Sequence, residues 1–136
     1  MIPLARARAI LDGALAFARA EGLQPLAVVV LDAGGHPVAT AREDGASLFR
    51  HDIARAKAMG ALGMGADTRV LAERAQGNPV FFGSVAAAVG GDIAFSPGGV
   101  LVRDAQGSIL GAVGISGDTG DRDEAAALAG INGEHS

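Results

Sequence analysis

Apolar residues near the start of the chain recur every three or four positions, a spacing typical of an amphipathic helix. They predict a helix from residue 4 to about residue 20, ending near Gly22. The next apolar run, residues 26–31, is continuous and rich in valine, so it predicts a strand buried on both faces. The residues that define the helix are Leu4, Ala7, Leu11, Ala14, Leu15 and Ala18.

A strand, a glycine-containing turn and a returning strand occur twice. The turn at residues 32–35 leads into a strand over residues 36–42. The same hydrophobic-Asp-Ala-x-Gly pattern joins residues 100–102 to residues 109–115. Glycine adopts the positive φ that tight hairpin turns require. The repeated hairpin predicts an antiparallel sheet.

The middle and the end of the chain are helical in pattern. Residues 47–66 and 68–76 predict two helices capped by Ser47 and Thr68, and residues 80–96 show no clear period.

We expect Asp118 or Thr119 to cap a last helix through about Ala129, and residues 132–136 to form a frayed tail. No linker interrupts the chain, so residues 1–136 are interpreted as one α+β domain with helices packed on an antiparallel sheet.

The composition predicts a core of small side chains. Among 136 residues there are 5 Phe and neither Trp nor Tyr, and the mean hydropathy is +0.32. Small side chains bury little area each, so we expect self-association into a homo-oligomer to remove further apolar surface from water. The absence of cysteine excludes disulfides, thiolate catalysis and iron–sulfur clusters.

Charge and hydropathy also limit the partners. The net charge is −4 and no Lys/Arg cluster occurs, which argues against a nucleic-acid surface. No apolar run reaches the roughly 20 residues of a membrane span. The N-terminus lacks the apolar region of a signal peptide, so we expect a cytoplasmic protein, with a removed signal peptide as the alternative.

Four segments together resemble the GlcG/HbpS family. That resemblance implies a profilin-like fold, with an antiparallel sheet of about five strands flanked by helices, often in higher oligomers. It extends to the C-terminal domain of PduO-type cobalamin adenosyltransferases, and it implies haem binding for some members. The segments are residues 28–36 with 42–46, residues 53–58, residues 97–100 with 111–117, and Thr119 with Asp123-Glu124.

Two histidines are candidates for binding iron. His36 follows the first turn and His51 lies early in the middle helix, and a neutral imidazole at either can ligate haem iron or transfer a proton. The alternatives are a histidine that supports the hairpin and a solvated helix residue. The three histidines lack the short spacing of a zinc site, which argues against a site built from several histidines.

Two basic residues are candidates for binding an anion. Arg42 can hold a carboxylate with two hydrogen bonds, or it can pair with Glu43 or Asp44. Lys57 lies among alanines on a helix that must bury one face. It can reach a carboxylate of a ligand or of the protein, or extend its ammonium group to water.

Backbone N–H groups supply the remaining candidate site. Gly98 and Gly99 allow close approach of a ligand or of a neighbouring strand. Ser116, Gly117 and Thr119 precede a helix whose N-terminus favours anions, although an ordinary connection has the same composition. The Gly-Lys-Ser/Thr ending of a phosphate-binding P-loop is missing.

These observations predict a small oligomeric protein that binds haem or a related small anionic ligand between the sheet and the helices. It would be accessory to small-molecule catabolism or sensing. The alternative is a cofactor-independent enzyme that acts on a small organic acid by proton transfer at His36 or Lys57. A structural or sensory subunit without a ligand is the third interpretation.

Overall fold

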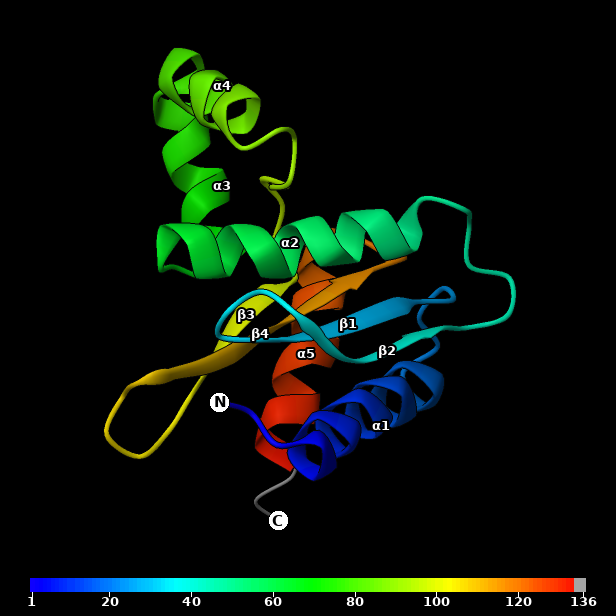
Figure 1. Cartoon of the computed structure of the whole chain (residues 1–136). Helices are drawn as coiled ribbons and strands as arrows, with labels where there is room; N and C mark the ends of the chain where they lie inside the picture. Colours follow the sequence, from blue (N-terminus) through cyan, green and yellow to red (C-terminus); the bar gives the residue numbers. More distant parts are fainter. Residues whose placement is uncertain (134–136) are drawn as a thin grey trace.

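Four antiparallel strands lie between two layers of helices in the computed structural model, which describes residues 1–133 (Figure 1). In chain order the elements are α1 (Leu4–Ala20), β1 (Ala27–Asp32), β2 (Pro37–Arg42), α2 (Arg50–Met64), α3 (Thr68–Gly77), α4 (Pro79–Ala88), β3 (Gly99–Arg103), β4 (Ile109–Ser116) and α5 (Gly120–Gly133).

The layers follow from the strand order β2-β1-β4-β3. Helices α1 and α5 cover one face of the sheet and α2 covers the other, while α3 and α4 project beyond the end of α2 (Figure 1). The predicted α+β class is confirmed. The expected count of about five strands is wrong for residues 1–133, which form four. The segment before β3 contains Gly90, Gly91 and Gly98, and the positive φ of all three interrupts extended backbone there.

Strand β1 is buried along its whole length, as its valine-rich sequence predicts. Val28 and Val30 pack into the core beneath α1 and α5. Val29 and Leu31 point the other way and pack against alanines of α2. Successive side chains of a strand point to opposite faces, so a central strand covered on both sides needs no polar positions.

Helix α1 has the predicted bounds, with a rotated buried face. Its buried residues are Ala7, Ile10, Ala14 and Ala18, whereas Leu4 is 48% exposed. The spacing of the large apolar residues therefore predicted the helix but not the middle of its buried face. That face is made mainly of alanines, whose small side chains allow α1 and α5 to approach closely. At their crossing, a Cβ built on Gly13 would lie 3.1 Å from the Cα of Gly130.

The two hairpin turns have matching hydrogen bonds. Asp32 Oδ1 accepts from the backbone N–H groups of Gly34 and His36 at 2.9 and 3.0 Å. Asp104 Oδ1 accepts from Gln106 and Ser108, both at 2.9 Å. Gly35 and Gly107, each three residues after the aspartate, have φ of +82° and +84°. The predicted repetition of one hairpin type is confirmed.

Glycines on β4 and β3 bring α2 directly onto the sheet. A Cβ on Gly114 would overlap the carbonyl oxygen of Ala54, and a Cβ on Gly99 would overlap that of Lys57. The backbone of α2 therefore rests against the strands at these points. A ligand placed between α2 and the sheet would have to separate the two layers.

The starts of the two central helices differ from the prediction. Helix α2 starts at Arg50 after Phe49, without a side-chain cap, so Ser47 lies outside it. Thr68 is the first residue of α3 rather than its cap, because its hydroxyl bonds to β3 instead. The segment without a clear period forms helix α4 from Pro79 onward.

The end of the chain is partly as predicted. Thr119 Oγ1 accepts from Arg122 N at 3.3 Å, in the manner of a helix cap. Helix α5 runs to Gly133 rather than Ala129, so residues 132 and 133 of the expected tail are helical. Residues 134–136 lie outside the described part. None of the helices within residues 1–133 has the length and apolar character needed to cross a bilayer.

Candidate functional site

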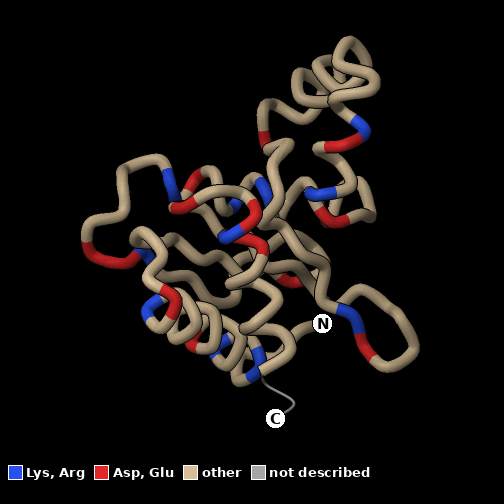
Figure 2. Tube along the Cα trace, turned by 180° about the vertical axis from the view of Figure 1, so that it is seen from behind, with Lys and Arg blue, Asp and Glu red and all other residues tan. Residues whose placement is uncertain are grey.

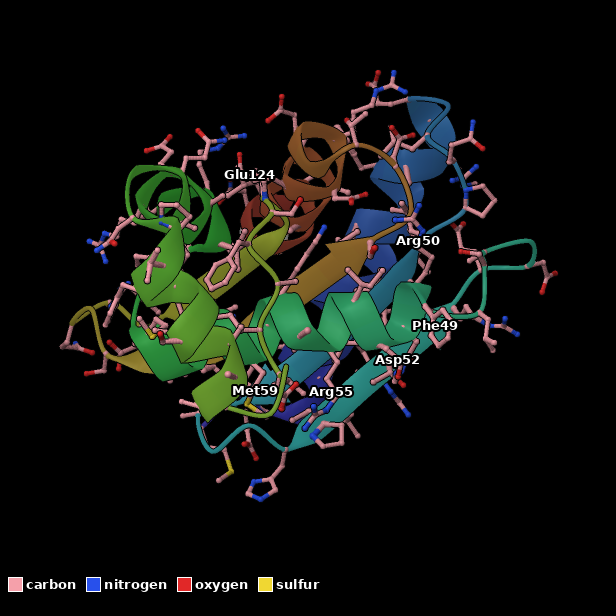
Figure 3. All side chains as sticks on the ribbon, turned by 90° about the horizontal axis from the view of Figure 1, so that it is seen from above. Phe49, Arg50, Asp52, Arg55, Met59 and Glu124 are labelled. Atoms are coloured by element: carbon pink, nitrogen blue, oxygen red, sulfur yellow. The ribbon has the colours of Figure 1, made fainter. Side chains whose placement is uncertain are left out.

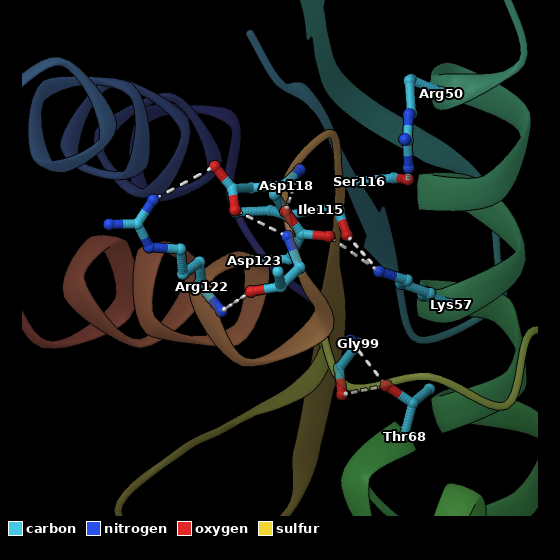
Figure 4. Close-up of polar contacts among 10 residues, drawn as sticks. Arg50, Lys57, Thr68, Gly99, Ile115, Ser116, Asp118, Arg122 and Asp123 are labelled. Atoms are coloured by element: carbon cyan, nitrogen blue, oxygen red, sulfur yellow. Dashed lines mark hydrogen bonds and ion pairs between the residues drawn. The ribbon is translucent and has the colours of Figure 1, made fainter. Parts of the chain in front are cut away.

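A buried ion pair joins α2 to α5 at the end of β4 (Figure 4). Lys57 Nζ donates to Asp123 Oδ2 at 3.1 Å and to the carbonyl oxygen of Ile115 at 2.9 Å. Lys57 is 2% exposed and Asp123 is 1% exposed. The sequence left open whether Lys57 reaches a carboxylate of a ligand or of the protein. In the structure its partner is a carboxylate of the protein, that of Asp123.

Burial and charge act in opposite directions on this pair. Burial lowers the pKa of Lys57, and the neighbouring Asp123 carboxylate opposes that shift. Burial raises the pKa of Asp123, and the Lys57 ammonium opposes it. Asp118 N also donates to Asp123 Oδ1 at 2.9 Å, so both carboxylate oxygens have donors. A buried pair with satisfied hydrogen bonds positions α5 against α2.

The loop before α5 uses its polar groups within the chain. Ser116 Oγ accepts from Arg50 Nη1 at 3.1 Å. Asp118 accepts from the backbone N–H groups of Gln24 and Thr119 at 2.8 and 2.7 Å, and these bonds hold its pKa below the ordinary value. The N–H groups predicted to bind an anion here therefore already bind carboxylates of this chain.

The predicted glycines of this region lie where segments approach closely. A Cβ on Gly98 would lie 2.8 Å from Ile115 O and 2.9 Å from Lys57 Nζ. A Cβ on Gly117 would overlap the carbonyl oxygen of Pro25. The structure thus places six predicted positions in or around one network, where each contacts other parts of this chain. These positions are Lys57, Gly98, Gly99, Ser116, Gly117 and Thr119.

Sequence reasoning missed two members of this network. Asp123 is a partner of Lys57 that the sequence pattern did not identify, and Arg50 is the second. The signal for Asp123 was Lys57 itself, because a lysine on a buried alanine face requires an anionic partner. No local pattern identifies which acid supplies it.

A second group of predicted residues lies at the opposite side of α2. A surface hollow of about 490 Å³ lies between β2 and the first turns of α2, and it contains both Arg42 and His51. Leu48 and Phe49, at the start of α2, are 75% and 68% exposed. The hollow is lined by Thr40, Ala41, Arg42, Leu48, His51 and Asp52.

Polar side chains of α2 point to two different sides of the helix. Figure 3 shows Phe49 at the beginning of the helix and Asp52 on the side of β2, whereas Arg50 points toward β4 and α5. Arg42 Nη1 makes a 3.4 Å hydrogen bond to the carbonyl oxygen of Ala46. Glu43, one partner considered for Arg42, instead pairs with Arg19 at 2.9 Å. Arg42 thus lines the hollow, and its guanidinium forms no ion pair with a carboxylate of residues 1–133.

His36 lies at the other end of β2 from Arg42. Its side chain is 79% exposed, with Nδ1 3.4 Å from Asp32 Oδ1. The N–H groups of His36 and Gly34 lower the pKa of that aspartate. The adjacent Gly35 contacts Met59, two helical turns beyond His51 on α2. The structure therefore does not bring His36 and His51 into one hollow.

The hollow combines the imidazole of His51, the guanidinium of Arg42, the hydroxyl of Thr40 and the exposed apolar side chain of Leu48, with the carboxylate of Asp52 also in its lining. Such a surface suits a partly apolar molecule that carries a carboxylate. A protein-family model described as haem degrading protein HbpS-like matches residues 2–132. The chain belongs to the HbpS-like family. The resemblance inferred from the sequence motifs is thereby confirmed.

Solved structures share the fold of this HbpS-like chain. A crystal structure of a PduOC–haem complex has a TM-score of 0.87 at 24% identity, covering 96% of this chain and 93% of that chain. The Klebsiella pneumoniae protein ORFY has a TM-score of 0.88 at 25% identity, covering 96% of this chain and 88% of that chain. A double mutant of Streptomyces reticuli HbpS gives 0.82 at 30% identity, covering 96% and 85%. Among curated proteins, no sequence matches significantly.

Proposed function

We propose that this protein binds haem, or a related small anionic and partly apolar ligand, in the hollow between β2 and α2. The observation that carries the proposal is the meeting of Arg42 and His51 in that hollow, in a chain of the HbpS-like family. The haem in the PduOC complex, a protein of the same fold, supports the ligand class.

The residues of the hollow fit the chemical groups of haem. The imidazole of His51 would hold the iron. Arg42 would hold a propionate, because a guanidinium matches the two oxygens of a carboxylate. Leu48 and Phe49 offer exposed apolar surface for the edge of the macrocycle. Haem would supply the redox and gas-binding chemistry of its iron.

Haemin titration tests the proposal. We expect low micromolar haemin to produce a saturable Soret shift with the protein. A linear absorbance increase without saturation, equal to that of haemin in buffer, would reject haem as the ligand.

Arg42→Gln tests the role assigned to the guanidinium. We expect haemin affinity to fall roughly tenfold, since a charged hydrogen bond is worth about 1.5–3 kcal/mol. Arg74→Gln on α3 is the matched control, because Arg74 is exposed and lies outside the hollow. Equal affinities of the two variants would remove Arg42 from the binding site.

Self-association is the second part of the proposal. Large apolar side chains are exposed on α4, where Val80 is 83% and Phe81 is 52% exposed. No charged residue occurs within residues 75–91, and this part of the chain is tan throughout in Figure 2. Covering such surface in a homo-oligomer removes it from water. We propose that the oligomer acts in the cytoplasm as an accessory to small-molecule catabolism or sensing.

A further inference from the structure

The two edges of the sheet are built differently. On β3, the pairing of Gly98 O with Ile115 N means that Gly99 and Leu101 direct their N–H groups away from β4. Thr68 Oγ1 accepts from Gly99 N at 2.8 Å, and Asp67 Oδ1 accepts from Leu101 N at 2.9 Å. Side chains at the start of α3 therefore close this edge.

The β2 edge has no such closure. Glu43 N bonds Leu26 O at 2.8 Å, so the alternation of the ladder points Ala39 and Ala41 toward β1 and Thr40 and Arg42 outward. Within residues 1–133, no neighbouring strand or side chain bonds the outward backbone groups of Thr40. A row of unpaired backbone groups is a template for another strand.

The usual protections of an exposed edge are confined to one end of β2. Pro37 and the irregularity opposite Leu31 both lie at its beginning. The residues after this irregularity, 39–42, pair regularly with β1, and their only charged residue is Arg42 at the far end. The edge is therefore open over the length of a short strand.

Hollows flank this edge on both faces of the sheet. The hollow of about 490 Å³ lies on the α2 side, and one of about 480 Å³ lies on the α1 side. Thr40 lines both of them. Side chains of an added strand, which alternate between faces, would line the open sides of both hollows.

We propose that β2 pairs antiparallel with β2 of a second copy, with Thr40 opposite Thr40 across a two-fold axis. The two four-stranded sheets then become one continuous sheet. This inference rests on the self-association part of the proposed function and is independent of haem.

The register explains why the strand added to the β2 edge would come from a second copy of this chain. Thr40 opposite itself is a favourable cross-strand pair. In this register Arg42 lies opposite position 38, an uncharged residue in the irregular part of β2, so no like charges are opposed. On α1, Arg8 and Asp12 line the hollow beside the edge. The two-fold axis reverses their order in the second copy, so the two copies present this acid and this base in opposite order along the interface.

The pairing also changes the ligand hollow. Thr40, Ala41 and Arg42 line the hollow and belong to the strand that the second copy would cover. The second strand would therefore close the open side next to Arg42 and exclude water from its guanidinium. This stronger electrostatic environment favours a carboxylate ligand.

Cysteine cross-linking tests the register, because the chain contains no cysteine. Opposed residues of a hydrogen-bonded antiparallel pair have Cα atoms about 5.5 Å apart, within the range of a disulfide. We expect mild oxidation of Thr40→Cys to give a covalent species of twice the 13.5 kDa chain mass. Val38→Cys alone, the matched control, should cross-link poorly, because position 38 lies in the irregular part of β2 and is not opposite itself. An equimolar mixture of Ala39→Cys and Ala41→Cys should cross-link well, because these two positions share one face of the sheet and are opposite each other in the proposed register.

Light scattering of the untagged protein completes the test. We expect a mass that is an even multiple of 13.5 kDa, halved by Thr40→Pro. Proline at position 40 removes an outward N–H and leaves the ladder to β1 intact, so circular dichroism should be unchanged. A monomeric wild-type protein overturns both this interface and self-association. An oligomer in which Thr40→Cys does not cross-link, or Val38→Cys cross-links equally, overturns the interface alone.

Discussion

Gly114→Ala is expected to lower the free energy of unfolding by roughly 4 kcal/mol or more, which is a large part of the 5–15 kcal/mol typical of a domain. The added methyl group would overlap the carbonyl oxygen of Ala54 in the backbone of α2. Backbone cannot rotate away as a side chain can, so the whole helix would have to lift from the sheet. Urea denaturation followed by circular dichroism measures the change.

Gly63→Ala is the matched control for this substitution. Gly63 lies on α2, the helix that Gly114 contacts, and a Cβ on Gly63 would meet no atom within 4 Å. We expect it to stabilise the protein by about 1 kcal/mol, because alanine favours helix more than glycine does. If both variants change stability by similar amounts, the close approach of α2 to β4 is not what Gly114 provides.

Lys57→Met is expected to lower the free energy of unfolding by about 3–5 kcal/mol, the usual cost of leaving one member of a buried ion pair without its partner. Methionine fills the volume of the lysine stem, so packing is largely kept. Asp123 would remain nearly fully buried, bonded to Asp118 N but without its cation. The double variant Lys57→Met/Asp123→Asn should recover much of the loss.

The pH dependence separates charge from packing at this pair. In Lys57→Met, burial raises the pKa of Asp123 without opposition from an ammonium group. A carboxyl with a higher pKa in the folded state favours folding when protonated, so the stability of the variant should rise as the pH falls. In the wild type the Lys57 ammonium opposes this rise of the pKa of Asp123, so acidification stabilises the wild type less than the variant. The difference in free energy of unfolding between the wild type and Lys57→Met should therefore become smaller at acidic pH. If this difference does not change with pH, the loss of stability comes from packing.

The sequence predicted those parts of the fold that repeat a local pattern. Asp32 and Asp104 each precede a glycine by three residues, and that spacing alone predicted two matching hairpins. The valine run of β1 predicted a strand covered on both faces. In each case the chemistry that decides the conformation lies within a few residues of chain.

Features that depend on distant partners were less predictable. The short helix α4 has apolar residues on all sides, so no periodicity marks it. Threonine is a residue type typical of helix caps, yet the hydroxyl of Thr68 bonds to Gly99 on the edge of β3, 31 residues further along the chain. The same limit holds for the candidate site, since Arg42 and His51 meet only because β2 lies beside the start of α2.

A haemin titration of His51→Ala beside His36→Ala tests the central claim most directly, with the position and saturation of the Soret band as the readout. Both histidines are candidates on sequence, and only His51 shares a hollow with Arg42. We predict that His51→Ala loses the wild-type Soret shift while His36→Ala retains it. Loss of the shift in His36→Ala with full retention in His51→Ala would contradict the site proposed between β2 and α2.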